Sequence, residues 1–346
     1  MKSRTLRADS ILGSAEGPCF FIVGVPRSGT TMLRLALNNH KDICVPSETW
    51  FFPKLSQRAS MYGDFSAESQ IRQFASDVAD FVVEVSQPFG SVFSITATEI
   101  EEVIRRSQVD CYAAAFWALM SHFAQRDGKT LWGEKTAFYT TIMPTLAQCY
   151  PSVRFIFLIR DPRDVVRSLQ NTPWGKRTYP TLADSALRWH VGMRDAVRGA
   201  RETGWERILS VRYEDFVHSP QPSLQRICEF LRLEFDENML LFYEKTEQNI
   251  TRISQAWHPN AFRPISDSSV GRWRETYSKE EAGLIELICG AQMTRWGYQR
   301  EGRSVRPRNL RKWAELQWRR VRRKLRELIE LPSRRGVGRG VLAQWL

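Results

Sequence analysis

The sequence predicts an α/β fold in which helices flank a parallel sheet, because strand-like runs alternate with helical patterns along the chain. Segments 19–25 and 154–159 are short runs of β-branched and aromatic residues, which are typical of buried parallel strands. A third such run, at 208–211, is predicted as another strand of the same sheet. A helical pattern follows each of these runs, as expected for a doubly wound sheet.

The remaining elements are predicted from the same patterns. Leu33, Ala36 and Leu37 form an apolar stripe at helical spacing, which predicts a helix directly after the first strand. In chain order we expect a helix at 31–39, a short strand at 42–45, helices between 68 and 124, and helices at 163–169 and around 224–230. No internal repeat and no low-complexity linker precedes residue 300.

Composition excludes several classes of protein. A chain of 346 residues with 42% hydrophobic and 25% charged residues can bury a core and is not mostly disordered. Its longest apolar runs have the length of strands, so we expect no bilayer-spanning helix. Six dispersed cysteines predict reduced, mostly buried thiols of a cytoplasmic protein, and five isolated histidines predict no metal site.

The positive charge is concentrated at the end of the chain. Residues 300–346 contain 15 Lys and Arg against 4 Asp and Glu, a balance of +11. The totals of 50 and 38 therefore leave 35 and 34 for residues 1–299, a balance of +1. We divide the chain into an N-terminal arm (1–18), a main domain (19–299) and a basic tail (300–346).

The tail contains a predicted amphipathic helix at 310–331, with tryptophans and leucines along one stripe and arginines mostly opposite. Such a helix is typical of proteins that lie on an anionic membrane surface, which predicts a peripheral location on the inner membrane face. Docking of the helix on the protein's own body is the alternative. Nucleic-acid binding ranks third, and no nucleic-acid partner is expected.

Residues 24–31, Gly-Val-Pro-Arg-Ser-Gly-Thr-Thr, form a glycine-rich turn between the first strand and the first helix. The spacing is that of a P-loop, whose backbone N–H groups and following helix N-terminus bind phosphate. Thr30 stands where a P-loop kinase or ATPase has its lysine, so Arg27 is the loop's side-chain cation. This substitution favours an anion other than the terminal phosphates of ATP.

Two motifs carry a family resemblance. Pro-Arg-Ser-Gly-Thr-Thr after the first strand and Arg-Asp-Pro-Arg-Asp-Val-Val-Arg-Ser after the strand at 154–159 resemble sulfotransferases that use 3′-phosphoadenylyl sulfate (PAPS). The arrangement is closest to tyrosylprotein sulfotransferases and their bacterial relatives, and it covers 19–298. The resemblance implies a P-loop-type sheet and sulfuryl transfer, without a metal, to an acceptor hydroxyl of a carbohydrate, a lipid-linked molecule, a small molecule or a peptide tyrosine.

The resemblance also implies which residues bind the donor. The first loop would hold the 5′-phosphosulfate end, a strand-end arginine and a serine eight residues later would hold the 3′-phosphate, and a tyrosine and a late basic element would lie near the nucleotide. At the matching positions stand Arg27, Ser28, Gly29, Thr30, Thr31, Arg160, Ser168, Tyr213 and Arg272, with Arg274 beside the last. The alternative for the second motif is a surface charge network of residues 160–164.

Catalytic roles follow from the same resemblance. Glu48 lies 21 residues after Arg27, at the interval of the family's general base. Lys135, in segment 132–136, matches the lysine that supports the bridging oxygen of the departing nucleotide, and the alternative is a solvated lysine in a loop. Glu134 is an alternative base. His40 falls where the first helix is predicted to end, which favours capping or packing.

The acceptor is less well specified. Trp50, Phe51 and Phe52 follow Glu48 and form either an acceptor surface or part of the core. Two other functions remain as alternatives to a sulfotransferase. One is a P-loop phosphotransferase, and the other is a non-catalytic membrane or nucleic-acid adaptor that keeps a vestigial nucleotide fold.

Overall fold

The computed structural model describes residues 12–89, 94–249, 255 and 257–302. The chain forms two compact units, which comprise Met1–Arg160 with Gly192–Val270 and Asp161–Val191 with Gly271–Leu346. The helix predicted at 310–331 and residues 1–11 of the predicted arm lie outside the described residues. No helix within the described ranges is long and apolar enough to cross a membrane.

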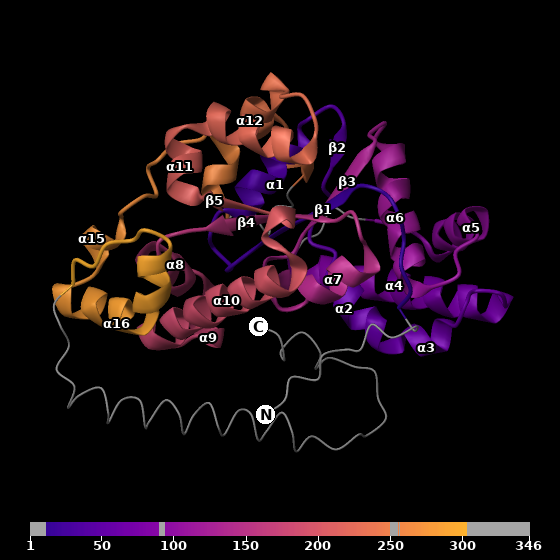
Figure 1. Ribbon diagram of the computed structural model, residues 1–346, viewed down its shortest axis with the longest axis horizontal. Coiled ribbons are helices and arrows are strands. Elements are labelled where there is room, and N and C mark those ends of the chain that lie inside the picture. Colours follow the sequence, from indigo (N-terminus) through magenta and orange to yellow (C-terminus); the bar gives the residue numbers. More distant parts are fainter. Residues whose placement is uncertain (1–11, 90–93, 250–254, 256, 303–346) are drawn as a thin grey trace, which may run out of the picture. The chain divides into compact units, whose positions relative to one another are not determined.

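The sheet lies in the first unit and has five parallel strands in the order β2-β3-β1-β4-β5 (Figure 1). The strands are β1 (Cys19–Gly24), β2 (Ile43–Cys44), β3 (Leu131–Lys135), β4 (Arg154–Ile159) and β5 (Ile208–Arg212). The predicted α/β fold with a parallel sheet is confirmed. The predicted strands are present to within one residue at each end, and only β3 was not anticipated.

The alternative of a solvated loop lysine at position 135 is wrong, because Lys135 ends strand β3 and is buried. β3 pairs with β1 through Cys19–Trp132 to Ile22–Lys135 and therefore lies next to the centre of the sheet. All five of its residues are buried, Glu134 and Lys135 included. Two adjacent charged residues are atypical of a buried strand, which explains why the hydrophobic pattern did not reveal it.

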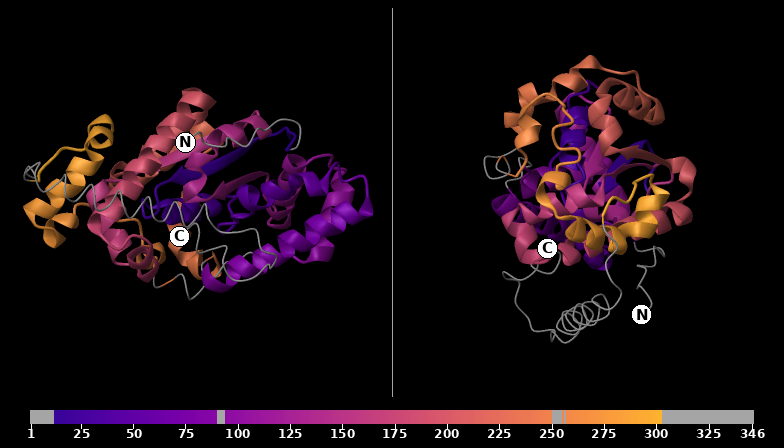
Figure 2. Two further views of the ribbon diagram at one scale, coloured as in Figure 1. Left: turned by 90° about the horizontal axis from the view of Figure 1, so that it is seen from below. Right: turned by 90° about the vertical axis from the view of Figure 1, so that its left-hand side faces the viewer.

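The helices of the first unit confirm the predicted alternation with strands. They are α1 (Thr30–Asn38), α2 (Phe51–Leu55), η1 (Ser56–Arg58), α3 (Ala59–Tyr62), α4 (Glu68–Phe89), α5 (Ala97–Ser107), α6 (Tyr112–Arg126), η2 (Ala137–Thr141), α7 (Met143–Cys149), η3 (Trp205–Arg207), α11 (Tyr213–His218), α12 (Pro220–Leu231), η4 (Glu237–Lys245), α13 (Thr246–Asn249) and η5 (Pro259–Phe262). The stretch predicted to be helical at 68–124 is thus α4, α5 and most of α6. A capping box of Thr96 and Glu99 begins α5, which lies beside α4 (Figure 2).

The two faces of the sheet are covered by different kinds of side chain. On one face, Phe20 and Ile22 belong to a buried cluster with residues of α1, α11 and α12, which lie above the strands in Figure 1. On the other face, the Phe21 ring contacts the rings of Trp132 and Tyr150 at centroid distances of 5.8 and 6.2 Å. Alternation of side chains along β1 explains this division.

The second unit is built from α8 (Pro162–Gln170), α9 (Pro173–Thr178), α15 (Trp273–Thr276) and α16 (Lys279–Arg295), and α10 (Leu182–Thr203) is divided between the two units. α8 begins at Pro162, and the Asp161 side chain accepts the Arg163 N–H at 2.9 Å. Arg163 also pairs with Glu286 at 2.6 Å, and both side chains are 3% exposed. This buried ion pair connects α8 to α16.

The predicted buried, unpaired thiols are confirmed for all six cysteines: Cys19, Cys44, Cys111, Cys149, Cys228 and Cys289. Burial raises the pKa of the Cys44 thiol to about 12. The thiols are therefore protonated at neutral pH and behave as small apolar side chains.

Candidate active site

Most of the predicted site residues lie at the carboxyl edge of the sheet. Parallel strands end at the same edge, and the loop 24–31, Lys135, Arg160 and Tyr213 follow or end β1, β3, β4 and β5 respectively. Glu48 follows β2 by four residues and reaches the same edge, where it pairs with Lys135. Topology thus brings together residues that are up to 186 positions apart, from Arg27 to Tyr213.

The loop between β1 and α1 has the backbone geometry of an anion cradle. Arg27 and Gly29 have φ angles of 72° and 96°, so the chain turns sharply before α1 begins at Thr30. The first N–H groups of a helix have no partner within the helix and point toward the loop. The Ser28 hydroxyl is 1% exposed and has no hydrogen-bond partner within the described part of the chain. A buried hydroxyl without a partner beside these N–H groups fits an anionic ligand.

Gly29 is required by both backbone angle and space. We expect Gly29→Ala to destabilise the protein by about 3 kcal/mol, since a Cβ atom at φ +96° would lie 2.5 Å from Cδ2 of Tyr213. Gly128→Ala is the matched control, because Gly128 has φ +69° but no atom within 4 Å of an added Cβ. Thermal unfolding should show a clearly larger loss for Gly29→Ala. Equal losses would mean that the ring contact does not constrain the loop.

Two arginines are held close to the loop. Arg160 donates from Nη1 to the carbonyl oxygen of Arg27 at 3.1 Å and lies over the Tyr213 ring at 4.2 Å from its centroid. Arg27 donates from Nη2 to the carbonyl oxygen of Trp257 at 2.7 Å. Burial, and secondarily the positive charge of Arg160, lowers the pKa of Arg27 to about 10, so Arg27 remains charged at neutral pH. Two neighbouring guanidinium groups would be stabilised by a bound anion.

Lys135 and Glu48 form an ion pair at the end of the cradle. Lys135 Nζ donates to Glu48 Oε1 and lies 3.4 Å from Thr31 Oγ1, in the first turn of α1. The Lys135 side chain is 4% exposed, whereas that of Glu48 is 32% exposed and so accessible to a ligand. Burial lowers the pKa of Lys135, although the negative charge of Glu48 opposes this effect.

Glu134 occupies a different environment from Glu48. It precedes Lys135 on β3 and therefore points to the opposite face of the sheet. Its Oε1 accepts hydrogen bonds from the hydroxyls of Thr136 at 2.6 Å and Thr49 at 3.1 Å. The residue is fully buried, and burial raises the pKa of its carboxyl to about 7. Glu134 is thus a buried, hydrogen-bonded carboxyl without access to a ligand.

The raised pKa of Glu134 predicts a pH-dependent stability. The folded protein keeps a proton that the unfolded chain loses above its ordinary pKa of 4.5, so the free energy of unfolding should fall as pH rises from 4.5 to about 7. The full effect is about 3 kcal/mol. Glu134→Gln should abolish this part of the pH dependence of the free energy of unfolding. At pH 8 the variant should be more stable than the wild type. Urea unfolding of both proteins at several pH values would measure the effect. The same pH dependence of stability in the wild type and the variant would contradict the raised pKa of Glu134.

Two further residues of the site were not predicted from the sequence. Arg34, within the buried stripe of α1, donates to the carbonyl oxygen of Val45 at 3.1 Å, and burial lowers its pKa to about 10. Burial and the positive charges of Arg27, Lys135 and Arg34 lower the pKa of His258 well below its usual value. His258 is therefore a neutral imidazole beside three cations. An arginine in an apolar helix stripe was the available signal for Arg34, and no local signal pointed to His258.

Ser168 and Arg272 belong to the second unit, where Ser168 lies on α8 and Arg272 is exposed directly before α15. Asp164 accepts the backbone N–H groups of Gly271 at 2.7 Å and Trp273 at 3.0 Å. Arg274 pairs with Glu301. The alternative of a surface charge network at 160–164 is wrong, because Asp161, Arg163 and Asp164 are buried. Asp161 and Arg163 form a buried ion pair with each other.

Three other residues near the site, His40, Phe51 and Phe52, are buried and have packing roles. His40 is buried, its Nε2 contacts the carbonyl oxygen of Glu234 at 2.9 Å, and its Nδ1 accepts the Asp42 N–H, which confirms a packing role. Phe51 and Phe52 are buried in the core, which confirms the packing alternative for them. The described residues contain no group of His, Cys, Asp and Glu side chains placed to hold a metal ion.

Comparison with known proteins identifies relatives over most of the chain. A family model described as "Sulfotransferase family" matches residues 18–237. A putative protein-tyrosine sulfotransferase of Caenorhabditis briggsae is 26% identical over 275 residues, which cover 78% of this chain and 85% of that protein. The nodulation protein NoeE of Sinorhizobium fredii is 26% identical over 345 residues, which cover 93% of this chain and 75% of that protein.

A solved structure supports the fold. The sulfotransferase domain of the Synechococcus olefin synthase superposes with a TM-score of 0.57 at 21% sequence identity. The alignment covers 83% of this chain and 96% of that domain.

Proposed function

The chain belongs to the sulfotransferase family and transfers the sulfuryl group of PAPS to an acceptor hydroxyl, and we propose that Glu48 and Lys135 carry out the chemistry. The observation that supports these roles is the Lys135–Glu48 ion pair beside Thr31, where the anion cradle meets an accessible carboxylate. The Ser28 hydroxyl, the α1 N-terminus and the Arg27 guanidinium fit the phosphosulfate end of the donor. Arg160 and Ser168 remain our proposal for the 3′-phosphate, with Tyr213 and Arg272 near the nucleotide.

Each proposed role follows from what the group can do. Glu48 takes the proton of the acceptor hydroxyl as that oxygen forms its bond to sulfur. The bond between sulfur and the bridging oxygen of the donor breaks, and negative charge develops on the departing phosphate. Lys135 and Arg27, held in the buried part of the site, stabilise that charge. Lys135 pairs with Glu48, so a donor phosphate that attracts the Lys135 ammonium would leave Glu48 available as a base.

The structure favours Glu48 over Glu134 as the base. Glu134 is fully buried on the opposite face of the sheet and so lacks access to an acceptor, whereas the Glu48 side chain is 32% exposed. The P-loop phosphotransferase and the vestigial adaptor have no comparable support, since the family model covers both motifs.

Transfer of radiolabelled sulfate tests the assignment. Purified protein is incubated with ³⁵S-labelled PAPS and a cell extract, and the label is followed in peptide, glycan and lipid fractions. We expect labelled product with the wild type and with Glu134→Gln, and none with Glu48→Gln. Label transfer by Glu48→Gln at the wild-type rate would place the base elsewhere.

We further propose that the predicted tail helix at 310–331 holds the enzyme on an anionic membrane surface, a proposal that rests on the amphipathic, arginine-rich sequence alone. Deletion of the residues after Arg303 should abolish co-sedimentation with anionic vesicles while leaving sulfuryl transfer intact. Unchanged co-sedimentation would contradict the proposal. Loss of thermal stability in the deletion variant would instead support docking on the body.

A further inference from the structure

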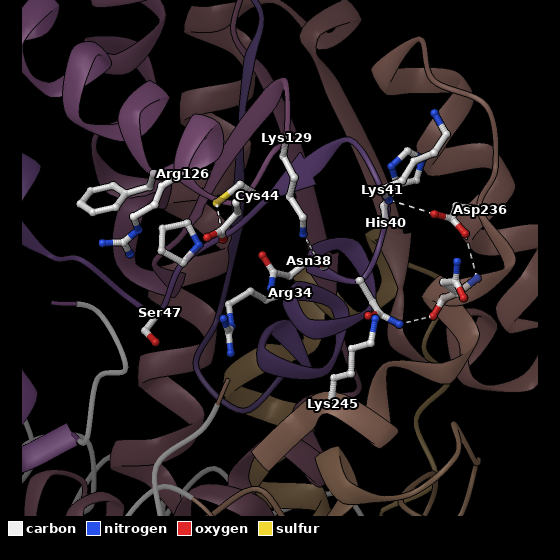
Figure 3. Close-up of a pocket in the computed structure, with 15 residues that line it drawn as sticks. Arg34, Asn38, His40, Lys41, Cys44, Ser47, Arg126, Lys129, Asp236 and Lys245 are labelled. Carbon is white, nitrogen blue, oxygen red and sulfur yellow. Dashed lines mark hydrogen bonds between the residues drawn. The ribbon is translucent and has the colours of Figure 1, made fainter. Parts of the chain in front are cut away.

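A cavity of about 620 Å³ opens beside Glu48 in the first unit. It is lined by the second half of α1, the residues before Glu48, the end of α6 and η4. Figure 3 shows Ser47 and Arg34 at one end of this cavity and His40, Lys41 and Asp236 at the other. Ser47, which directly precedes Glu48, and Arg34, whose charge the Glu48 carboxylate acts on, both line the cavity, so one end of it lies next to the proposed reaction centre.

The cavity is positively charged. Five cations line it against two carboxylates, a balance of +3: Arg34, Lys41, Arg126, Lys129 and Lys245 against Asp127 and Asp236. Lys41 pairs with Asp42 at 2.6 Å, outside this lining, so the other four cations leave a balance of +2. Asp236 accepts the backbone N–H groups of Lys41 and Asn238, both at 2.9 Å, and the Cys44 thiol lies 3.7 Å from Asp127. The carboxylates are therefore engaged in local contacts, and the balance of charge favours an anionic ligand.

One cation is held in place by backbone groups. Lys129 donates from Nζ to the carbonyl oxygens of Asn38 and Ile43, the latter at 2.8 Å. These two carbonyl oxygens hold the Lys129 ammonium in the cavity wall. Arg34 is shared between this cavity and the site, because the Glu48 carboxylate acts on its charge.

The sheet edge at the cavity is closed to an added peptide strand. β2 is an edge strand, and such edges bind extended peptides through their backbone groups. Here the Val45 N–H donates to the Asn38 side chain at 2.8 Å, and the Val45 carbonyl accepts from Arg34 at 3.1 Å. The Ile43 carbonyl accepts from Lys129. Side chains of this chain thus occupy the groups that a peptide would need.

An aromatic pair flanks the reaction centre. Trp50 follows Glu48 by two residues, Phe138 follows Lys135 by three, and their rings lie 5.3 Å apart between centroids at an angle of 44°. Both side chains are half-buried, unlike the neighbouring Phe51, which is fully buried. Trp50 has a left-handed backbone with φ 57° and directly precedes α2. Half-exposed aromatic rings next to a base offer a flat apolar surface to a ring-shaped acceptor.

We propose that the acceptor is an acidic oligosaccharide, with a sugar ring on Trp50 and Phe138 that presents its hydroxyl to Glu48, and with carboxylate or sulfate groups of adjoining sugars in the basic cavity. The inference rests on the proposed function. Three asparagines, Asn38, Asn39 and Asn238, also line the cavity, where Asn38 accepts the Val45 N–H and Asn39 donates to the Asn238 carbonyl oxygen. An acidic peptide would match the charge but would find the edge of β2 occupied.

Matched acceptors test the inference. The wild type is assayed with labelled PAPS and three acceptors: a hexasaccharide of alternating glucuronic acid and N-acetylglucosamine, the same hexasaccharide with its carboxyls reduced to alcohols, and a tyrosine peptide flanked by glutamates. We expect kcat/KM for the acidic hexasaccharide to exceed that for the reduced one by about tenfold or more, since several charge-assisted contacts are lost on reduction. The peptide should be the poorest acceptor.

Variants locate the effect in the cavity. Arg126→Met and Lys245→Met remove exposed cations at its rim, whereas Lys279→Met removes an exposed cation of the second unit. We expect the double variant Arg126→Met/Lys245→Met to raise KM for the acidic hexasaccharide about tenfold with unchanged kcat. The reduced hexasaccharide should show no change, and Lys279→Met should match the wild type with both.

The possible failures are distinguishable. Equal transfer to the two hexasaccharides, or preference for the peptide, would overturn the inference and leave sulfuryl transfer standing. So would an absence of transfer to the acidic hexasaccharide by a protein that binds 3′-phosphoadenosine 5′-phosphate. A wild type that neither binds this nucleotide nor sulfates any acceptor would overturn the proposed function itself.

Discussion

Glu48→Gln should lower kcat for sulfuryl transfer by about 1,000-fold while leaving the affinity for 3′-phosphoadenosine 5′-phosphate within about threefold of the wild type. The amide keeps the shape of the carboxyl but cannot accept the acceptor's proton. Glu48 is 32% exposed and contacts Lys135. Its replacement therefore removes the partner of one buried charge, the Lys135 ammonium. Steady-state kinetics with labelled PAPS and calorimetry with the product nucleotide measure the two quantities separately.

Glu134→Gln is the matched control for Glu48→Gln, because it makes the same chemical change on the other face of β3. It should keep kcat within about threefold and should alter the pH dependence of stability instead. A thousandfold loss of kcat in Glu134→Gln, together with normal turnover by Glu48→Gln, would exchange the two roles.

Lys135→Met should lower kcat by about 100- to 1,000-fold, because it removes the cation that faces the charge developing on the leaving phosphate. Methionine has a similar length and apolar character, so it should fit the nearly fully buried position. The exposed Lys279→Met, in the second unit, should leave kcat unchanged.

The lowered pKa of Lys135 adds a pH signature to this prediction. Activity needs the protonated amine, so the rate should fall as pH rises through the pKa of Lys135, which burial places below the ordinary value of 10.5. Lys135→Arg keeps a charge that is not lost in this range, and its residual activity should persist to higher pH. An alkaline decline at the same pH in both proteins would assign it to another group.

The fold was predictable where local signals were strong. The apolar runs of β1 and β4 and the glycine-rich turn before α1 were recognised because each is a short, contiguous pattern. β3 was not recognised, because its hydrophobic pattern is interrupted by Gly133, Glu134 and Lys135, and pairing with β1 and β2 makes that segment a strand. Its neighbours in the sheet, rather than its own composition, determine its conformation.

Individual site residues were predictable from their spacing in the sequence, but the contacts between them were not. Glu48 and Lys135 were identified separately, whereas their ion pair depends on the order of β2, β3 and β1 in the sheet. The choice between Glu48 and Glu134 likewise depended on which face of β3 each could reach. The Trp50–Phe138 contact joins residues 88 positions apart and has no local signature.

We expect the loop after β1 to bind the donor of a sulfotransferase in preference to ATP. Isothermal titration calorimetry of the wild-type protein with 3′-phosphoadenosine 5′-phosphate and, in parallel, with ATP tests it most directly. The Thr30 substitution, the Arg27–Arg160 pair and the family membership predict that 3′-phosphoadenosine 5′-phosphate binds at least about tenfold more tightly, since ATP lacks a 3′-phosphate for charge-assisted contacts. Tighter binding of ATP would contradict the account.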